Sequence, residues 1–342
     1  MPDEPRSPEV VVLGELNPDI VVTAVPQLSF GQREDLVGAT TMTVGSSVAI
    51  TACGIARLGT RVALVGVVGD DAFGAFMLSR LGERGVATDL VRTVEGGRTG
   101  SSVILVSADD AGDRQILTDL GVMADLRAGD LPLDRLEGVG HLHIGSWFLH
   151  TGAVGDLPRL LEQARRRGLS TSVDPNDDPA RTWTAHLPEA LRHVDVFFCN
   201  ENEAQGVAIG SGAAGPRSRH LAARHILTEL APGGVVVLKC GAEGAYAHTN
   251  DAVVHVQAPV TEVVDTVGAG DTLAAGFLHA RLGGADVGAA LRLGVAAGSL
   301  STQGSGGVAA QPGSPEAKAL AGTLAVTRHD PAAFLADDLG GR

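Results

Sequence analysis

Short apolar runs recur along the chain, and each is bounded by glycine, aspartate or asparagine. Runs of this kind are typical of strands that are buried on both faces of a parallel sheet. On this pattern we expect strands over residues 10–13, 62–68, 141–144, 169–173, 194–199 and 235–238.

Segments with helical spacing of apolar residues separate these runs. They predict helices over residues 49–58, 72–84, 155–167 and 219–230. Strands that alternate with helices at this spacing form right-handed βαβ units. The predicted fold class is therefore α/β, with a doubly wound, mostly parallel sheet flanked by helices.

Two segments break this alternation. Residues 20–44 are rich in threonine and valine with proline and glycine between them, and residues 99–118 contain two β-like runs around the polar turn 109–113. Both patterns favour antiparallel hairpins. We expect them to form a small antiparallel β lid, over about residues 18–44 and 98–120, that stands off the main sheet.

These elements place one domain over residues 10–313. The polar, proline-containing residues 1–9 are predicted to be a disordered tail, and residues 314–342 are expected to form a terminal helix and a loose tail.

The formal net charge of −14 narrows the range of partners. Nucleic acid and anionic membrane surfaces are poor partners for so acidic a chain, and no apolar run is long enough to cross a bilayer. The first residues lack the apolar core of a signal peptide, and the three cysteines show no C-x-x-C pair. The sequence therefore predicts a cytoplasmic location.

The most informative stretch is Asp265-Thr266-Val267-Gly268-Ala269-Gly270-Asp271, which leads into a helix rich in small residues. Its glycines allow a tight turn, and the free N–H groups of a helix N-terminus favour an anion. A carboxylate in a first helical turn is also stabilised by the helix dipole, so Asp271 can be read as a helix cap alone. The functional alternative is a general base beside an anion hole, which is what phosphoryl transfer to a hydroxyl needs.

This motif resembles the signature of the PfkB/ribokinase family of carbohydrate kinases. Segments similar to other family blocks follow in the same order over nearly the whole chain, at residues 14–19, 45–59, 68–74, 174–176 and 200–203. The resemblance implies a ribokinase-like fold and transfer of the γ-phosphate of ATP to a hydroxyl of a sugar or sugar-like substrate. It also implies Mg²⁺ as a cofactor, K⁺ in some members, and a homodimer that forms through the lid.

The resemblance assigns roles to individual residues. Asp271 matches the catalytic base, and the anion hole matches Gly268, Ala269 and Gly270. The substrate is expected to bind at Asn17, Asp19, Gly45, Ser46 and Asn176, with Arg98 at the edge of the lid as a further candidate.

The nucleotide is expected at Asn200, Glu203, Lys239, Gly241 and Gly244. Among these, Asn200 and Glu203 match an N-x-x-E motif that the family links to Mg²⁺ and phosphate, so Glu203 is an indirect magnesium ligand. Asp265 matches a position near a monovalent-cation site.

The chain departs from the family pattern at two positions near its first helix. Ser46 stands where the family has a second glycine, and Ile50 stands where it has an asparagine. An isoleucine side chain cannot form a hydrogen bond with a sugar hydroxyl, so the hydroxyl pattern of the substrate is left open.

Alternatives within the same fold are a nucleoside kinase and a kinase of keto-deoxy sugar acids. The chain is only 3% aromatic, which disfavours stacking of a nucleobase. An anionic substrate needs a cation, and Arg33, Arg98 and Arg114 lie in or beside the predicted lid.

Other classes have less support. A sugar sensor on a kinase scaffold has no need of the base Asp271, and a nicotinamide-dependent dehydrogenase would carry a glycine fingerprint after the first strand. The only lysines, Lys239 and Lys318, lie outside any G-x-x-x-x-G-K-[ST] motif, which excludes a P-loop enzyme.

Overall fold

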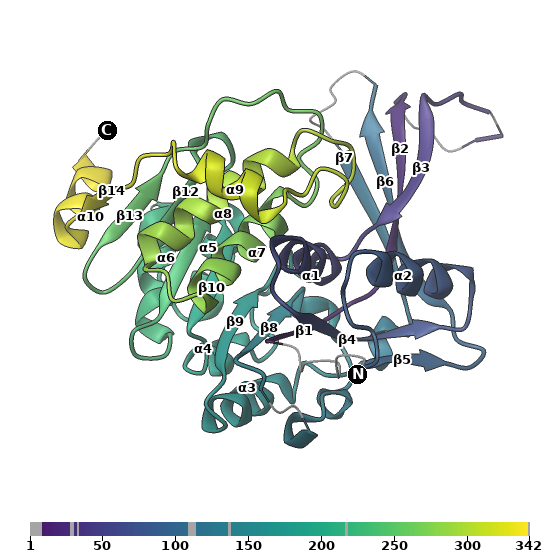
Figure 1. The fold of residues 1–342 in the computed structure, drawn as a ribbon, viewed down its shortest axis with the longest axis horizontal. Helices are drawn as coiled ribbons and strands as arrows, with labels where there is room; N and C mark the ends of the chain where they lie inside the picture. Colours follow the sequence, from purple (N-terminus) through teal and green to yellow (C-terminus); the bar gives the residue numbers. More distant parts are fainter. Residues whose placement is uncertain are drawn as a thin grey trace, which may run out of the picture.

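The computed structural model describes residues 9–27, 31–32, 34–108, 114–135, 138–215 and 218–340. Within these residues a ten-stranded sheet runs through the molecule, and a four-stranded sheet stands off one side of it (Figure 1). The order of the large sheet is β14-β13-β12-β11-β10-β9-β8-β1-β4-β5. Its strands are β1 (Val10–Leu13), β4 (Val62–Gly69), β5 (Val91–Val94), β8 (His141–Gly145), β9 (Ser170–Asp174), β10 (Val196–Asn200), β11 (Val235–Lys239), β12 (Ala245–His248), β13 (Val253–Val256) and β14 (Thr327–His329).

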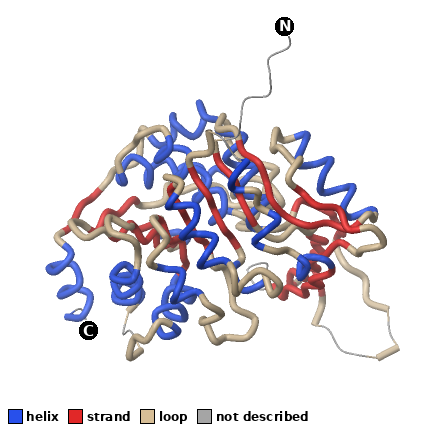
Figure 2. Tube along the Cα trace, turned by 90° about the horizontal axis from the view of Figure 1, so that it is seen from below, coloured by secondary structure: helices blue, strands red, loops and turns tan. Residues whose placement is uncertain are grey.

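Neighbouring strands pair in parallel along the part of the sheet with the order β11-β10-β9-β8-β1-β4-β5. Strands β12, β13 and β14 extend the sheet beyond β11, each antiparallel to its neighbour. Helices cover both faces of the sheet, as the view in Figure 2 shows. They are α1 (Ser47–Leu58), α2 (Ala72–Glu83), α3 (Leu157–Arg166), α4 (Leu187–Leu191), α5 (Glu201–Gly210), α6 (Arg219–Glu229), α7 (Ala269–Leu282), α8 (Val287–Ser301), α9 (Ser314–Ala321) and α10 (Pro331–Gly340).

The central strands are apolar at every position because they supply two cores at once. In β1, Val11 and Leu13 point into the core that α3, α4, α5 and α6 cover, and Val10 and Val12 point into the core under α1, α2, α7 and α8. Continuous apolar runs are what a sheet covered on both faces requires. The predicted fold class, a mostly parallel α/β sheet flanked by helices, is therefore confirmed.

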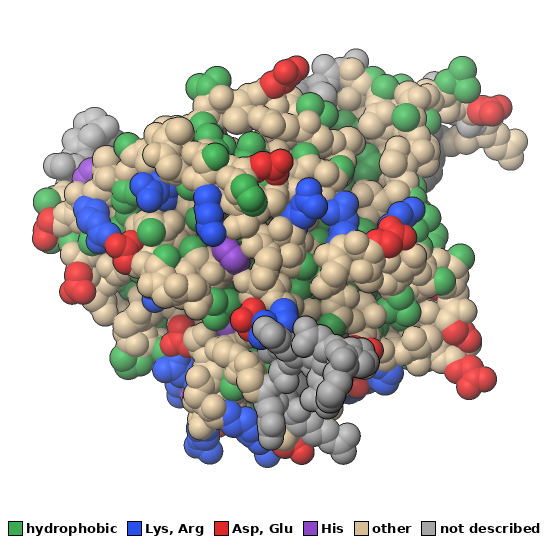
Figure 3. Space-filling model, in the orientation of Figure 1, with side chains coloured by type: hydrophobic (Ala, Val, Ile, Leu, Met, Phe, Trp, Pro, Cys, Tyr) green, Lys and Arg blue, Asp and Glu red, His purple; other side chains and the backbone are tan. Residues whose placement is uncertain are grey.

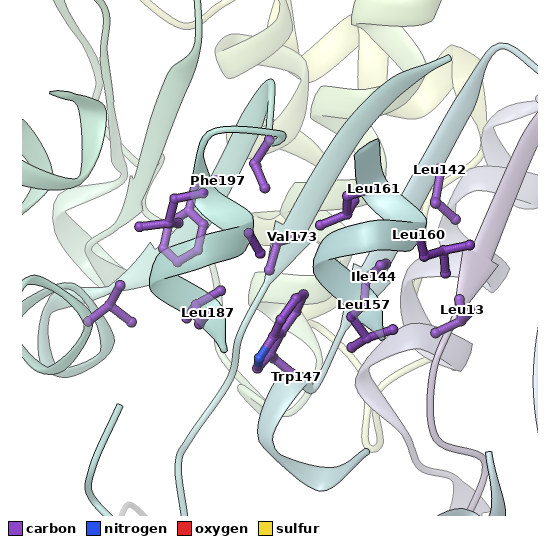
Figure 4. Close-up of a cluster of buried hydrophobic side chains, with 14 of the residues drawn as sticks. Leu13, Leu142, Ile144, Trp147, Leu157, Leu160, Leu161, Val173, Leu187 and Phe197 are labelled. Carbon is purple, nitrogen blue, oxygen red and sulfur yellow. The ribbon is translucent and has the colours of Figure 1, made fainter. Parts of the chain in front are cut away.

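One core is built around Trp147, which is fully buried among aliphatic side chains such as Leu157 and Val173 (Figure 4). Its indole Nε1–H donates to the carbonyl oxygen of Ala185 at 2.9 Å, so the polar atom of the ring is satisfied.

The four-stranded sheet is the lid. Its order is β3-β2-β6-β7, with β2 (Pro18–Val25), β3 (Ala39–Val44), β6 (Thr99–Ser107) and β7 (Arg114–Gly121). The outer pairs are antiparallel as expected, but the central pair β2–β6 is parallel, because each predicted hairpin contributes one strand to it. The predicted turn 109–113 lies outside the described residues.

The register of the lid separates polar from apolar side chains. Thr43, Asp19, Ser102 and Thr118 are direct partners across the four strands and form a polar row on one face. Since neighbouring residues in a strand face opposite sides, Met42, Ile20, Val103 and Leu117 form an apolar row on the other face.

The C-terminal segment differs from the expected helix and loose tail. After α9, β14 pairs with β13 at the edge of the large sheet, and α10 follows. The short strand, 327–329, is too polar to be recognised from its pattern. Of the predicted N-terminal tail 1–9, only Glu9 is among the described residues.

None of the described helices is long and apolar enough to span a bilayer. Acidic and basic side chains are interspersed over the face shown in Figure 3, where the basic ones form no continuous surface.

Candidate active site

The polar residues of the candidate site gather at the carboxyl ends of the parallel strands. Glu15 and Asn17 follow β1, Ser146 follows β8, Asp174 ends β9, and Lys239 ends β11. This edge of a doubly wound sheet is where loops from several strands converge and bind ligands. Helix α7 begins at the same edge, because Asp271 in its first turn bonds to Ser47 at the start of α1. The lid stands off one side of the large sheet (Figure 1).

Asp271 lies in the first turn of α7. The hydroxyl of Ser47 donates to its Oδ1, and the hydroxyl of Thr51 donates to its backbone oxygen at 3.3 Å. Burial, and then repulsion from Asp174, raise the pKa of Asp271 to about 7, although Lys239 and Ser47 pull it down. A carboxyl group with a pKa near neutrality is suited to take a proton from a hydroxyl.

The glycine turn before α7 is closely packed. Gly268 has a φ of 72°, and a Cβ there would lie 2.7 Å from the Cα of Gly307. A Cβ at Gly270 would lie 3.2 Å from Cδ of Lys239. Only glycine therefore fits at 268. Ala269 N donates to the carbonyl oxygen of Thr266 at 3.3 Å, and the N–H groups that follow it in the first turn of α7 lie beside the lysine chain.

Lys239 carries the positive charge of the site. Its Nζ lies 2.6 Å from Oδ2 of Asp174 and 4.0 Å from Oε2 of Glu203, and its side chain is 12% exposed. Although burial lowers the pKa of Lys239, the carboxylates of Asp174, Glu203 and Asp271 raise it above its ordinary value. The lysine is therefore a permanent cation among three carboxyl groups.

Asn200 and Glu203 form a capping box at the start of α5. The Asn200 side chain accepts from the N–H of Glu203 at 2.9 Å, and the carboxylate of Glu203 accepts from the backbone N–H of Asn200 at 2.7 Å. Burial, partly offset by Lys239, raises the pKa of Glu203 to about 7.

A cavity of about 570 Å³ opens next to the glycine turn before α7. It is lined by Lys239, Gly241, Gly244, Ala269 and Gly270, and by mostly apolar residues of the loop 257–263 and of α8. This volume lies within the range of small-molecule sites, and its phosphate-compatible end is the glycine turn.

Asp19 and Asn17 occupy the lid side of the cleft. Asn17 Nδ2 donates to Oδ1 of Asp19 and to Oγ of Ser102, each at 3.2 Å. Burial, and then the charge of Asp271, raise the pKa of Asp19 to about 7, whereas Asn17 and Arg114 lower it. A Cβ at Gly45 would lie 2.1 Å from Oδ1 of Asp19, so the lid carboxylate packs directly on the glycine backbone.

Ser46 and Arg98, two of the expected substrate-binding residues, each have protein partners in this structure. Ser46 is the N-cap of α1, and its hydroxyl accepts from Ala49 N at 3.0 Å while it donates to the carbonyl of Glu15 at 2.7 Å. Arg98 has a 73% exposed side chain that pairs with Asp119. The substrate contacts expected of these two residues stay predictions.

Asp265 ties two loops together. Its carboxylate accepts from Val267 N at 2.9 Å and from Gly306 N at 2.8 Å, so both oxygens are engaged by backbone groups. Of the other two arginines proposed for an anionic substrate, Arg33 lies outside the described residues and Arg114 begins β7.

Three residues of the site were not assigned from the sequence: Glu15, Ser47 and Asp174. Ser47 contacts Asp271, Glu15 is 3% exposed beside Ser47, and Asp174 holds Lys239. All three belong to segments that resemble family blocks, and two of them are carboxylates close to the end of a predicted strand: Asp174 follows its strand directly and Glu15 follows after one glycine. That position was the available signal for those two.

The geometry agrees with comparisons to known proteins. The model of the pfkB family of carbohydrate kinases matches residues 7–313. The chain belongs to the pfkB family of carbohydrate kinases. Members of the family are phosphotransferases with an alcohol group as acceptor, so the predicted function class is confirmed.

Named relatives of this kinase agree with the family. It is 30% identical over 292 residues to an ATP-dependent ribose-1-phosphate kinase of Halopiger xanaduensis, covering 85% of this chain and 90% of the relative. It is 30% identical over 288 residues to a 2-dehydro-3-deoxygluconokinase of Bacillus subtilis, covering 81% and 85%.

The fold is shared with solved structures. An E. coli protein provisionally named ribokinase II, in complex with ATP and Mg²⁺, superposes with a TM-score of 0.77 at 22% identity. The match covers 92% of this kinase and 98% of that chain, and it confirms the ribokinase-like fold.

Proposed function

We propose that this kinase transfers the γ-phosphate of ATP to a hydroxyl of a sugar or sugar-like acceptor, with Asp271 as the general base. The observation that carries the proposal is the place of Asp271, between the nucleotide-sized cavity and the polar row of the lid. Its pKa of about 7 lets it accept a proton near neutral pH.

The chain's own groups divide the work of the transfer. Asp19 and Asn17 hold acceptor hydroxyls so that one of them meets Asp271, which takes its proton as the oxygen attacks. The N–H groups that follow Ala269 in the first turn of α7, beginning with Gly270, and the ammonium group of Lys239 stabilise negative charge on the phosphoryl group. The lid covers the acceptor and keeps water away.

The carboxyl groups around Lys239, at the edge of the cavity, would hold Mg²⁺. Oδ1 of Asp174 is buried and has no hydrogen-bond partner among the described residues, and Oε2 of Glu203 lies 4.0 Å from the same lysine. Carboxylate oxygens of this kind suit Mg²⁺, directly or through its waters. When bound, Mg²⁺ neutralises charge on the phosphates.

We also propose that Asp265 supports a monovalent-cation site. The carboxylate accepts from the N–H groups of Val267 and Gly306 and so fixes two loops, and backbone carbonyl groups of fixed loops are ligands that suit K⁺. Activity in KCl should exceed activity in choline chloride at equal ionic strength, and equal activity would refute this site.

The apolar row of the lid supports a homodimer. Met42 and Leu117 are 43% and 51% exposed at its two ends, with Ile20 and Val103 between them. Leu117→Asp should therefore convert a dimer to a monomer in analytical ultracentrifugation. Ile209→Asp, at a 56% exposed position on α5, should leave the dimer intact.

A second candidate acceptor is an anionic sugar, because Arg114 lies close enough to lower the pKa of Asp19. Two relatives are named for a sugar acid and a sugar phosphate. Arg114→Ala should raise KM for sugar acids or phosphates alone, while Arg98→Ala, whose partner is Asp119, should not. Equal effects of Arg114→Ala on neutral sugars would exclude this candidate.

The test of the proposed function is ADP release with Mg·ATP against neutral sugars, sugar acids, sugar phosphates and nucleosides. Asp271→Asn should lower kcat by about 10²–10⁴-fold or more while nucleotide affinity is kept. Near-normal kcat in that variant would refute the base, and nucleotide binding without turnover on any acceptor would favour a sensor.

A further inference from the structure

A directed chain of hydrogen bonds ends on Asp271. It runs from the backbone N–H of Ser146 to the side chain of Asn176, from there to the hydroxyl of Ser47, and from Ser47 to Oδ1 of Asp271. The first two of these hydrogen bonds are each 3.0 Å long.

The direction of this chain is fixed by its first member. A backbone N–H can only donate, so Asn176 must present Oδ1 to Ser146 N, and its amide nitrogen must then face Ser47. An amide nitrogen can only donate, so the Ser47 hydroxyl accepts this bond. The proton of that hydroxyl is then available for Asp271, whose Oδ1 can accept it only without a proton of its own.

Glu15 holds the other side of Ser47. Its Oε1 accepts from Ser47 N and from Ser146 Oγ, each at 2.8 Å, and its backbone oxygen accepts from the capping hydroxyl of Ser46 at 2.7 Å. Oε2 of Glu15 is buried and has no partner among the described residues. The start of α1 is thus anchored on a buried carboxyl group that lies away from the cavity of the nucleotide.

We propose that Ser47 is a positioning residue for the base: Asn176 and Glu15 fix it so that its hydroxyl proton points at Oδ1 of Asp271, which leaves Oδ2 to receive the proton of the acceptor. This inference rests on the proposed role of Asp271 as the base. It adds to that role a fixed orientation of the carboxylate and a control of its basicity.

Other charged groups also face Asp271, from several elements. Asp174 from β9 and Glu15 after β1 raise its pKa, and Lys239 from β11 lowers it. Asp19 from the lid and Glu203 from α5 also interact with its charge. Ser47 is the uncharged member of this set, so its removal changes the hydrogen bond without changing any charge.

The test is the pH dependence of kcat/KM, whose acidic limb reports the base in the free enzyme. Loss of a hydrogen bond to an ionised group should move this limb up by about one pH unit in Ser47→Ala, because the bond lowers the pKa of Asp271. At about pH 6, kcat/KM should fall by roughly 10-fold, and the loss should shrink above about pH 8. Ser47→Thr, which keeps the hydroxyl, should restore the limb.

Ser79→Ala is the matched control, because it removes an exposed serine hydroxyl that bonds to Glu83 on α2. It should leave the limb in place. A Ser47→Ala profile that overlays the wild type would overturn the proposal, as would a uniform loss at every pH with no shift.

A double-mutant cycle tests whether Asn176 acts through Ser47. Asn176→Ala should shift the limb in the same direction as Ser47→Ala, and the double variant should shift it no further. Additive shifts would show that Asn176 acts independently of Ser47 and would overturn its part in the chain.

Asp271→Asn separates the two levels of the argument. If that variant keeps its activity, the proposed base itself is wrong. If it is inactive while Ser47→Ala keeps the wild-type profile, only the positioning role fails.

Discussion

Substitution of Lys239 tests whether its ion pairs with Asp174 and Glu203 stabilise the folded protein. Its ammonium group lies 2.6 Å from Asp174 and 4.0 Å from Glu203, and only 12% of its side chain is exposed. Lys239→Met keeps much of the volume but leaves two buried carboxyl groups without their cation. Removing one partner of a buried ion pair costs about 3–5 kcal/mol.

That loss should be visible as thermal destabilisation of the nucleotide-free enzyme. At about 2 °C per kcal/mol for a chain of this length, Tm should fall by about 6–10 °C. The loss should be larger at about pH 8 than at about pH 5. Without the lysine, the pKa of Glu203 rises further above about 7, so protonation relieves the repulsion as the pH falls through that value.

The chain contains its own control, because the only other lysine, Lys318, is exposed on α9. Lys318→Met should change stability by less than about 0.5 kcal/mol. Adding Asp174→Asn to Lys239→Met should recover part of the loss, since a buried charge disappears. If Lys239→Met and Lys318→Met have the same Tm, the carboxylates are hydrated and the ion pair does not stabilise the fold.

Two further predictions follow from the packing around the acceptor side. Gly45→Ala should raise the acceptor KM at least about 10-fold, because its Cβ would lie 2.1 Å from Asp19 Oδ1. The control is Gly82→Ala, because a Cβ at that position meets nothing within 4 Å. If steady-state kinetics give the same acceptor KM for both variants, this prediction is refuted. Burial raises the pKa of Glu15 to about 7, so the folded state keeps a proton that the unfolded chain releases near pH 4.5. The free energy of unfolding should therefore fall by about 2–3 kcal/mol between pH 5 and pH 8 through this group. When this free energy is measured by urea unfolding at each pH, it should depend less on pH in Glu15→Gln than in the wild type. The same pH dependence in both proteins would mean that Glu15 is ionised in the folded state.

The fold could be predicted from the sequence because the apolar pattern of each central strand is sufficient to identify that strand. A run such as Val10–Leu13, apolar at each position, fits only a strand covered on both faces. The strand β14 had no such signal, because Thr327–His329 is polar and exposed and is held by pairing with β13. Tertiary pairing decided its conformation, and its own residues did not.

The candidate site was accessible in part, for a similar reason. Asp271 and the glycine turn lie within one continuous motif, whereas the partner of Asp271, Ser47, is 224 residues away in the chain. The choice between Ser46 and Ser47 depends on the backbone: φ of 67° at Ser46 turns its hydroxyl into the cap of α1 and presents the next serine to the cleft. The pairing of Arg98 with Asp119 was not accessible either, because Asp119 lies 21 residues further along the chain, on β7.

The pairing of β14 with β13 covers an edge of the large sheet that would otherwise be exposed. An unpaired strand edge is a template for association with other chains, and β13 would be such an edge if the polypeptide stopped where the family match stops, at residue 313. A chain shortened to the matched residues would keep the whole cleft but would be prone to aggregate. Because β14 is synthesised after every residue of the cleft, the nascent protein is protected along this edge only once β14 has left the ribosome.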